Sequence, residues 1–371
     1  MWLQRLSLLN FKNYPEAELR FSPAVNAFTG NNGAGKTNLL DAIHYLSLCK
    51  SYFNPVDSQS IRMGADVFMI QGEFERSERQ EVISVGLKRN QKKQFRRNKK
   101  EYSRLADHIG LFPLVMITPN DSSIITEGSE ERRKFVDNVI SQTDPDYLDE
   151  LIVYNRNLLA RNMLLKQIAE TGKYDPALLE IYDDQLVASG TRLFGKRQRF
   201  LESFTEIFSR HYRYLTESAE EVRLVYDSPL IGQDFAELIK KSVERDRALQ
   251  RTTVGIHKDD LVFTIHEMPL KKFGSQGQQK SFLIALKLAQ YTYLDQQKGF
   301  KPLLLLDDIF DKLDDRRTRK LMQMVSAHDF GQIFITDTSR DRIRAIFEEI
   351  KVAVRIFDVE QGNITGNAQN E

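Results

Sequence analysis

A short run near the start of the chain combines glycines, a lysine and a hydroxyl residue at fixed spacing. The run reads Gly30, Asn31, Asn32, Gly33, Ala34, Gly35, Lys36 and Thr37, which fits the pattern of a phosphate-binding loop. In such a loop, backbone N–H groups surround the phosphates, the lysine reaches the β- and γ-phosphates, and the hydroxyl ligates Mg²⁺. The run therefore predicts an ATP site that works with Mg²⁺. The alternative is a chance glycine turn ahead of a helix.

A second candidate lies far along the chain, where an apolar run of leucines ends in Asp307 and Asp308. Such a run is typical of a buried strand, and its end would present both carboxylates at one edge of a sheet. Asp307 is then predicted to hold Mg²⁺ through its water shell. Asp308 is predicted to be the catalytic residue, because a carboxylate beside the γ-phosphate orients or deprotonates the attacking water. A strand ending at an aspartate-rich helix cap is the alternative.

A polar, glycine-bearing turn precedes the aspartates and leads directly into an apolar helix pattern. Its candidate binding residues are Ser275, Gly277 and Gln278, because a helix start with an exposed serine and glycine attracts anions. Taken alone, the turn would more often be a simple capped helix. Placed shortly before the two aspartates, it resembles the signature motif of ABC-type ATPases, which faces the γ-phosphate bound by the opposite protomer. ATP would then join two copies of the chain.

The elements that must position these residues follow from a change of texture along the chain. Residues up to about 118 mix short apolar runs with turn residues, a strand-rich pattern that resumes after 251. Between 130 and 215 the pattern is long, charged and helical, with breaks near 144–145 and 172–176. We therefore expect one discontinuous α/β head from 1–118 plus 252–371, and an inserted helical lobe over 119–251.

One helix of this lobe carries apolar residues at intervals of seven. They are Leu179, Leu186, Leu193, Phe200 and Ile207, and a stripe with this period could pack against the preceding helix as in a coiled coil. A plain amphipathic core helix is the alternative. It is favoured by Gly190 and Gly195, which weaken a helix, and by the polar residues at the companion heptad positions.

Composition places the chain among ordinary globular proteins. Hydrophobic residues make up 41% and charged residues 28% of the 371 positions, and the mean hydropathy is -0.44. No apolar run approaches the roughly 20 residues that span a bilayer, and the first residues lack the layout of a signal peptide, so we expect a cytoplasmic protein. A single cysteine, Cys49, allows no internal disulfide, and the histidines have no zinc-type spacing.

The formal net charge of +1 gives no overall attraction to nucleic acid, so a DNA surface would have to come from local clustering. One such cluster lies over 88–100, and its candidate DNA contacts are Lys92, Lys93, Arg96 and Arg97. Phe95 in its middle could stack on a base. The alternative is a solvated hairpin whose charges protect strand edges. No helix-turn-helix or zinc-finger pattern is present, so sequence-specific reading of DNA is not expected.

Several motifs together give a specific resemblance. They are Asn10-Phe11-Lys12-Asn13-Tyr14, the loop at 30–40, Arg132-Arg133-Lys134-Phe135-Val136-Asp137, the run at 154–162, the run at 253–261, and Phe273-Gly274-Ser275-Gln276-Gly277-Gln278-Gln279-Lys280. With these motifs the chain resembles the RecF family of bacterial DNA replication and repair proteins over nearly its whole length. The resemblance implies an α/β head of the ABC/SMC type with mixed sheets and an inserted helical lobe similar to a short coiled coil.

The resemblance also implies an activity and partners. These are weak, DNA-dependent ATP hydrolysis that acts as a conformational switch, a homodimer that forms on ATP, and binding to double-stranded and gapped or single-stranded DNA. RecO and RecR would be the protein partners in loading the recombinase RecA on single-stranded gaps, and the protein would support induction of the SOS response. A non-hydrolysing, ATP-gated DNA scaffold stays open as an alternative. Less favoured classes are a transporter-type ATPase subunit and a metabolic kinase.

Carried over residue by residue, the resemblance assigns Asp314 to a loop that crosses the dimer interface. It also exposes departures from the family pattern. Tyr52-Phe53-Asn54 stands where the family commonly has an arginine, and Pro119-Asn120-Asp121 replaces its usual acidic pair after proline. Thr336 stands where many ABC-type proteins have a switch histidine, which puts the mode of γ-phosphate sensing in question.

Overall fold

The computed structural model describes residues 1–217, 220–310, 315–327 and 329–368. The chain divides into two units. The head unit comprises Met1–Asp121, His211–Glu217 and Lys280–Glu371, and the arm unit comprises Ser122–Arg210 and Ser218–Gln279. The predicted division differs over 119–121 and 211–217, which belong to the head unit, and over 252–279, which belong to the arm unit. The reason for the last difference is strand pairing, since β10 (Asp260–Ile265) pairs with β9 (Val222–Asp227) in one antiparallel sheet.

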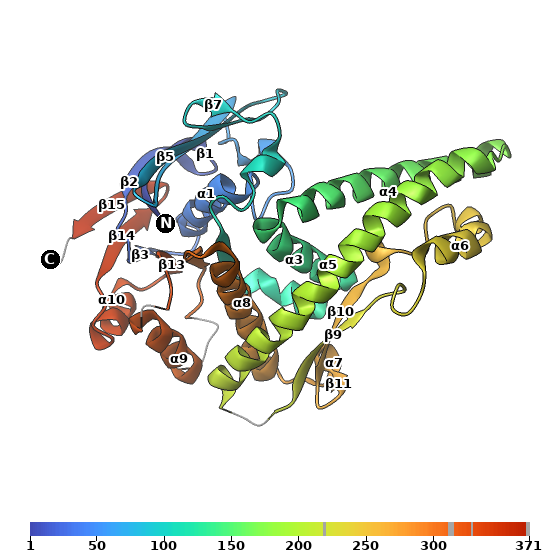
Figure 1. Ribbon diagram of the computed structural model, residues 1–371. Coiled ribbons are helices and arrows are strands. Elements are labelled where there is room, and N and C mark those ends of the chain that lie inside the picture. The colour runs from blue at the N-terminus through green and yellow to red at the C-terminus, as the bar shows by residue number, and fades with distance from the viewer. Residues whose placement is uncertain (218–219, 311–314, 328, 369–371) are drawn as a thin grey trace. The chain divides into compact units, whose positions relative to one another are not determined.

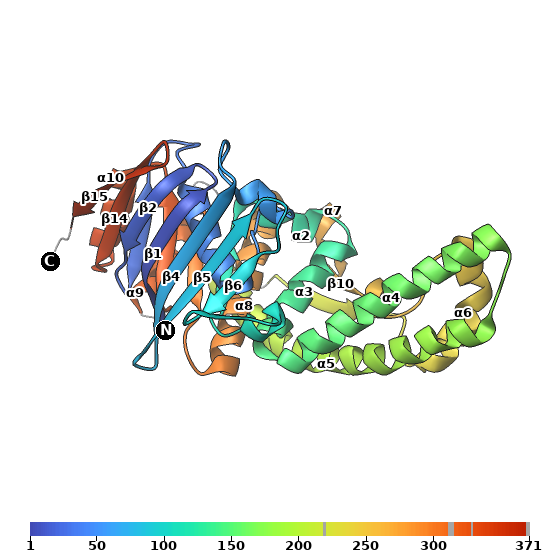
Figure 2. The ribbon, with the colours of Figure 1, turned by 90° about the horizontal axis from the view of Figure 1, so that it is seen from above.

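The first sheet of the head unit is antiparallel and has six strands in the order β2-β1-β4-β5-β6-β7. Their bounds are β1 Trp2–Phe11, β2 Tyr14–Arg20, β4 Val67–Arg76, β5 Arg79–Lys88, β6 Gln94–Arg97 and β7 Lys100–Glu101. Buried and less buried residues alternate along β5, as expected for a sheet with one face on a core. Figure 2 shows β1, β4, β5 and β6 side by side. Ser77 and Glu78 form a two-residue hairpin turn with φ of 50° and 63°, a geometry that matches the twist of the strands.

The second sheet of the head unit has six strands in the order β15-β14-β3-β13-β12-β8. Their bounds are β3 Val25–Thr29, β8 Leu114–Ile117, β12 Leu303–Leu306, β13 Ile333–Asp337, β14 Val354–Glu360 and β15 Asn363–Ala368. All neighbours are parallel except β14 and β15. Every residue of β3, β8, β12 and β13 is buried, which explains the uninterrupted apolar runs. Because the strands are parallel, their carboxyl ends meet at one edge.

Helix α1 joins the two sheets into one core. It contacts β4 and β5 of the antiparallel sheet and β8 and β13 of the parallel sheet, and its Leu39, Leu40, Ile43 and Leu46 are fully buried. The other helices with residues in the head unit are η1 Asp57–Ser60, η2 Leu105–His108, η3 Pro119–Ser122, the end of α5, most of α8 Gln276–Lys298, α9 Asp315–Ser326 and α10 Arg340–Glu349, and α1 itself is Lys36–Leu48. The predicted α/β head with mixed sheets is therefore confirmed.

The arm unit is mainly helical. Its elements are α2 Ser123–Thr126, α3 Ser129–Thr143, α4 Pro145–Thr171, α5 Pro176–Thr216 up to residue 210, α6 Phe235–Leu249, η4 Ile256–Lys258, α7 Leu270–Phe273 and the sheet β11-β10-β9 with β11 Met268–Pro269. Both predicted helix breaks are confirmed. The Asp144 side chain caps α4 by accepting a hydrogen bond from Tyr147 N at 2.9 Å, and Gly172 ends α4 with φ of 68°. No described helix is long and apolar enough to cross a bilayer.

Helices α4 and α5 run side by side in the arm unit (Figure 1), and ion pairs such as Arg192 to Glu150 at 2.7 Å join them. All members of the predicted apolar stripe are buried, with at most 4% of any one exposed. Helix α6 also packs here, because a Cβ atom at Gly190 would lie 2.6 Å from the Phe235 ring. The stripe therefore belongs to an antiparallel helix pair, as the coiled-coil interpretation predicts. A third helix also packs on this pair, as on a plain amphipathic core helix.

Candidate nucleotide site

The loop at 30–37 follows the central strand β3 and leads into α1 in the head unit. Gly30, Gly33 and Gly35 have φ of 147°, 81° and 116°, a region that side chains disfavour. A Cβ atom at Gly30 would lie 2.2 Å from the Val359 carbonyl oxygen, and one at Gly35 would lie 2.3 Å from Asn13 Nδ2. The backbone path therefore favours glycine at all three positions, and close packing also requires it at Gly30 and Gly35, whereas a Cβ atom at Gly33 would meet nothing within 4 Å.

Two neighbouring turns hold the loop by its carbonyl groups. From the β1–β2 turn, Asn13 Nδ2 donates to Ala34 O at 3.0 Å and the Tyr14 hydroxyl donates to Gly35 O at 3.0 Å. From the β14–β15 turn, Gly362 N donates to Ala34 O at 3.1 Å. Burial raises the pKa of Tyr14, which keeps the hydroxyl protonated and able to donate. The first N–H groups of α1 have no acceptor within the helix and suit a phosphate.

Lys36 folds back along the loop. Its ammonium donates to Gly30 O at 2.7 Å and to Asn31 O at 3.1 Å, and only 3% of the residue is exposed. An ammonium has three donors, so two carbonyl contacts fix its place and leave capacity for an anion. This is the geometry expected of a lysine that reaches bound phosphates.

Thr37 and Asp307 meet at the carboxyl edge of the parallel sheet, although 270 positions separate them. The Thr37 hydroxyl lies 2.9 Å from Asp307 Oδ1, and 5% of Asp307 is exposed. Burial raises the pKa of Asp307, while hydrogen bonds from Thr336 and Thr37 act against that rise. A hydroxyl and one carboxylate are oxygen ligands that suit Mg²⁺, whose remaining positions are usually filled by water and phosphates. The residues present therefore fit the predicted cation.

Asp308 lies next to Asp307 and is only partly buried. Its backbone has φ of 44°, in the left-handed region, and its N–H donates to the Thr336 hydroxyl at 2.8 Å. The structure thus brings Lys36, Thr37 and the two aspartates to one edge of the head unit, the arrangement expected of a nucleotide site.

Known proteins resemble this chain over nearly all of the sequence. The family model described as RecF/RecN/SMC N terminal domain matches residues 2–365. The DNA replication and repair protein RecF of Flavobacterium johnsoniae is 50% identical over 359 residues, which cover 97% of this chain and 100% of that protein. The chain belongs to the RecF family. The RecF protein of Phocaeicola vulgatus is 48% identical, over 98% of both chains.

Solved structures agree with this assignment. The structure of the recombination mediator protein RecF with ATP in the RecFOR pathway superposes with a TM-score of 0.89 at 30% identity, and the match covers 99% of this chain and 98% of that one. An SMC head bound to the C-terminal winged-helix domain of ScpA superposes with a TM-score of 0.59 at 16% identity, over 100% and 98% of the two chains. The RecF and SMC heads therefore share the fold described above.

Two departures from the RecF pattern contact each other. The Tyr52 hydroxyl donates to Asp121 Oδ1 at 2.5 Å, and Lys287 pairs with the same carboxylate at 2.6 Å. Asp121 is buried and also accepts from Thr118 N at 2.6 Å. A buried carboxylate needs such partners, since an unpaired one would be costly. No spacing rule could have linked Tyr52 to Asp121 across 69 positions.

The predicted signature residues lie in the arm unit at the start of α8. Ser275 N donates to Gln278 Oε1 at 2.7 Å, and Gln278 N donates to Ser275 Oγ at 3.2 Å, which is a reciprocal capping box. Gln278 Nε2 also donates to Glu220 Oε1 at 2.9 Å. Gly277 lies in the first turn between them. The capped helix, which was the alternative for this turn taken alone, is present. Ser275 is exposed. The predicted dimer-loop residue Asp314 lies outside the described residues.

The basic stretch separates into two kinds of residue. Lys93 pairs with Asp57 at 2.8 Å and donates to Cys49 O at 2.6 Å, while Arg97 pairs with Glu81. Lys92 and Arg96 are exposed, and the exposed Arg96 also lies 3.9 Å from Glu101 and donates to Gln94 Oε1 at 2.9 Å. Phe95 is only 1% exposed and packs beside the Tyr102 and His108 rings. Stacking of Phe95 on a base, suggested by the sequence, is therefore wrong, because a base cannot reach a buried ring.

Proposed function

We propose that this protein is an ATP-dependent DNA clamp of recombinational repair and replication restart, in which ATP joins two copies on duplex or gapped DNA. The observation that carries the proposal is the meeting of Thr37 with Asp307, at 2.9 Å, beside a loop whose packing requires Gly30 and Gly35. The structure of a RecF protein with ATP supports the choice of nucleotide.

Each nucleotide-site residue of the head unit has a distinct task in this proposal. Lys36, already fixed by two carbonyls, binds the β- and γ-phosphates. The N–H groups at the start of α1 bind phosphate oxygens. Asp308 orients the attacking water or accepts its proton. Thr37 and Asp307 would hold Mg²⁺, whose chemistry is to neutralise charge that develops on the phosphates.

The second copy would complete the site through Ser275, Gly277 and Gln278. The capping box fixes the start of α8 and leaves the Ser275 O–H proton available, because the hydroxyl only accepts in that contact. A phosphate at this helix start would also benefit from the helix dipole. Dimerisation would then depend on ATP, and slow, DNA-dependent hydrolysis would reopen the clamp.

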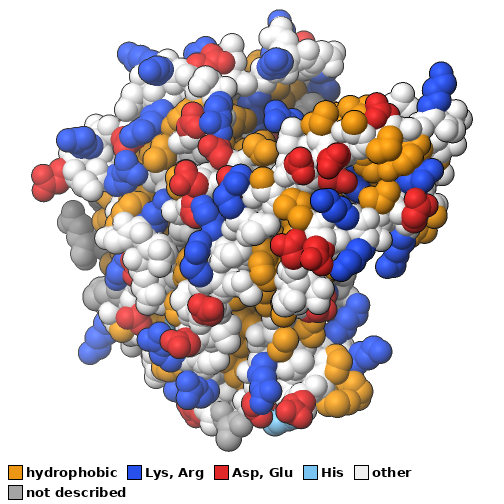
Figure 3. Space-filling model, turned by 45° about the vertical axis from the view of Figure 1, so that its right-hand side comes forward, with side chains coloured by type: hydrophobic (Ala, Val, Ile, Leu, Met, Phe, Trp, Pro, Cys, Tyr) orange, Lys and Arg blue, Asp and Glu red, His pale blue; other side chains and the backbone are white. Residues whose placement is uncertain are grey.

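The names of the relatives support a cellular setting for this proposal. Proteins named for DNA replication and repair, and one solved in the RecFOR pathway, support RecO and RecR as partners at gaps where RecA is loaded, with an effect on the SOS response. The protein would act in the cytoplasm at the nucleoid. On the face in Figure 3, lysines and arginines are scattered among acidic and apolar side chains. In this proposal, contact with DNA rests on local groups such as the exposed Lys92 and Arg96.

The solution mass of the wild type and of Lys36→Met, with and without ATP and Mg²⁺, tests the proposal. We expect ATP to double the wild-type mass from 43.0 kDa and to bring binding to gapped duplex DNA, and we expect both effects to be lost in Lys36→Met. Lys50→Met, on an exposed residue at the end of α1, is the matched control. A wild type that hydrolyses ATP as a monomer would contradict the clamp.

Mixing two inactive variants tests the composite site more sharply. Lys36→Met keeps its own Ser275, and Ser275→Arg keeps its own Lys36. A mixed dimer therefore holds one site with an intact lysine and an intact signature. We expect neither variant to dimerise alone, and the mixture to form dimers with ATP. If the mixture stays monomeric while each variant folds normally, the second copy does not complete the site.

A further inference from the structure

The hydroxyl of Thr336 contacts both aspartates of the nucleotide site. Thr336 Oγ1 lies 2.8 Å from Asp307 Oδ1, and it accepts the Asp308 N–H at 2.8 Å. The distance from Thr336 Oγ1 to Asp308 Oδ1 is longer, at 3.5 Å. Thr336 itself is fully buried. The Thr336 hydroxyl is therefore hydrogen-bonded to the side chain of Asp307 and to the backbone of Asp308.

The number of protons fixes the direction of these bonds. A threonine hydroxyl has one proton to donate and lone pairs to accept. Because it accepts the Asp308 N–H, its own proton goes to the nearest carboxylate oxygen, which is Asp307 Oδ1. The Thr37 hydroxyl approaches the same oxygen at 2.9 Å. Asp307 is thus held between two hydroxyls, one on α1 and one on β13.

The backbone of Asp308 gives the second contact its importance. Its φ of 44° lies in the left-handed region, which costs energy for a residue with a side chain, although aspartate adopts it more readily than most residues do. The bond from Asp308 N to Thr336 is a contact at this peptide that can enforce it. This backbone geometry sets the direction in which the Asp308 side chain leaves the chain.

The position of Thr336 on its strand is also informative. Its neighbours Ile333, Phe334 and Ile335 are apolar and buried, as is typical of a parallel sheet. A buried hydroxyl is costly unless it is hydrogen-bonded. Here both capacities of the hydroxyl are used on the two aspartates, so its role lies at the site and not in filling the core.

We propose that Thr336 is the positioning residue that sets the Asp307 carboxylate for its cation and the Asp308 carboxylate for the attacking water. The inference rests on the proposed ATPase function and adds a residue to it. Groups that orient a metal-binding carboxylate typically change metal affinity about 10- to 100-fold when removed. In this proposal Thr336 acts through its hydrogen bonds to Asp307 and Asp308.

Two matched pairs of side chains isolate the hydroxyl. Threonine and Thr336→Val have nearly the same shape, and Thr336→Ser and Thr336→Ala differ only by the hydroxyl. Mn²⁺ serves as the probe, and its binding to each protein with ATPγS is followed by electron paramagnetic resonance, which needs no turnover. We expect Thr336→Val and Thr336→Ala to bind Mn²⁺ about 10-fold or more weakly, and the wild type and Thr336→Ser to bind alike.

The rate of ATP hydrolysis gives a second readout. At saturating Mg²⁺, loss of the hydroxyl should lower kcat about 10-fold or more and leave KM for ATP nearly unchanged, because Lys36 and the loop still bind the phosphates. Thermal unfolding without nucleotide checks that each variant folds. If Thr336→Val does not fold, the comparison of Thr336→Ser with Thr336→Ala still tests the role of the hydroxyl.

The outcomes separate the inference from the function on which it rests. If the wild type binds no Mn²⁺ with ATPγS, the proposed nucleotide site fails. If the wild type binds it and the variants without a hydroxyl bind it equally well with unchanged kcat, Thr336 has no positioning role.

Discussion

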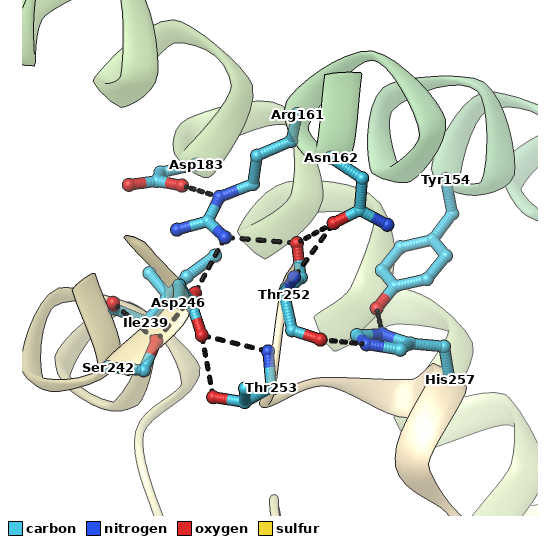
Figure 4. A network of polar contacts seen from close by, with 10 residues as sticks. All are labelled: Tyr154, Arg161, Asn162, Asp183, Ile239, Ser242, Asp246, Thr252, Thr253 and His257. Carbon is cyan, nitrogen blue, oxygen red and sulfur yellow. Dashed lines mark hydrogen bonds and ion pairs between the residues drawn. The ribbon is translucent and has the colours of Figure 1, made fainter. Parts of the chain in front are cut away.

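The arm unit and the nucleotide site of the head unit both bury charged side chains, but in different ways. Elsewhere the head unit also buries an ion pair, Lys287 with Asp121 at 2.6 Å. In the arm unit, Arg161 is fully buried and pairs with Asp183 at 2.5 Å and with Asp246 at 2.6 Å, as Figure 4 shows. In the head unit, Lys36 and Asp307 are almost as deeply buried, yet among the described residues neither of them forms an ion pair. Lys36 contacts carbonyls and Asp307 contacts hydroxyls.

The difference teaches how a structural charge can be distinguished from a functional one. A buried charge that meets its opposite within the chain holds elements together, and the arm network joins α4, α5 and α6 in this way. Lys36 and Asp307 contact neutral dipoles and form no ion pair among the described residues, although the charge of Lys36 acts against the raised pKa of Asp307, so both have electrostatic capacity left for a ligand. These two charges therefore mark a site, although burial raises the pKa of both Asp183 and Asp307.

Arg161→Met breaks the arm network and has the largest expected effect. Removing one partner of a buried ion pair leaves uncompensated charges on Asp183 and Asp246, which typically costs about 3–5 kcal/mol. Urea unfolding measures the loss of stability. The matched control is Arg192→Met, which removes a more exposed pair with Glu150 between α4 and α5 and should cost no more than about 1 kcal/mol.

The comparison also predicts what Arg161→Met leaves unchanged. Under conditions in which the variant is folded, its affinity for ATP should match that of the wild type, because the network does not include a residue of the nucleotide site. An equal loss of stability from both arginine variants would show that burial does not distinguish the two pairs.

Asp308→Asn tests the opposite kind of charge. An amide cannot accept the proton of water, and loss of a general base typically lowers kcat about 10²- to 10⁴-fold. Stability should change little, since Asp308 is partly exposed and has no ion pair among the described residues. Steady-state phosphate release measures kcat, and solution mass shows whether the dimer still forms with ATP.

Asp341→Asn, on an exposed residue at the start of α10, is the control for a lost carboxylate in the same unit. Unchanged phosphate release in Asp308→Asn would show that Asp308 is not the general base. A wild type that forms the dimer with ATP but releases no phosphate would favour the alternative in which ATP only gates a scaffold.

Local patterns made much of this molecule predictable. The loop at 30–37, the aspartates after β12 and the helix breaks at 144–145 and 172–176 were all visible in the sequence, because each depends on residues adjacent in the chain. The buried stripe of α5 was visible for the same reason, through the helical period. Such features need only neighbouring residues to form.

Contacts between distant residues were not predictable. Thr336 could be recognised as a departure from a pattern, but not as a bridge between Asp307 and Asp308. The bond from Tyr52 to Asp121 and the burial of Phe95 in a basic stretch likewise depend on how strands and helices pack. The placement of 252–279 was missed because antiparallel pairing with β9 outweighed the resumption of strand-like sequence.

A pH titration sharpens the comparison through His257, a neutral member of the arm network. Its Nδ1 lies 2.8 Å from the Tyr154 hydroxyl and its Nε2 lies 3.1 Å from Thr252 O. Burial lowers the pKa of His257 to about 4, against about 6.5 in an unfolded chain. Between these values the unfolded chain binds more protons, so the free energy of unfolding falls as pH falls from about 6.5 toward 4.

Between pH 7 and pH 5 this loss should reach about 2 kcal/mol. The measurement is the difference in unfolding free energy between the wild type and His257→Gln at each pH. Other buried groups, such as His44 and His108, titrate in both proteins and cancel in the difference. We expect the advantage of the wild type to shrink at pH 5. A difference that does not change with pH would mean that His257 does not supply this dependence.

The smallest expected effect separates the structural and exposed members of the basic stretch. Lys92 and Arg96 are exposed, and replacing both with Gln should reduce the slope of log K for DNA binding against log salt concentration by about one for each lost phosphate contact. Lys93→Gln instead removes the ion pair with Asp57, so it should lower stability and leave the salt dependence unchanged. Binding to gapped duplex DNA over a series of salt concentrations, with ATP present, measures both variants. If Lys93→Gln changes the salt dependence as much as the exposed pair does, then its contacts in the free protein give way to DNA, and an internal ion pair would no longer mark a charge as purely structural.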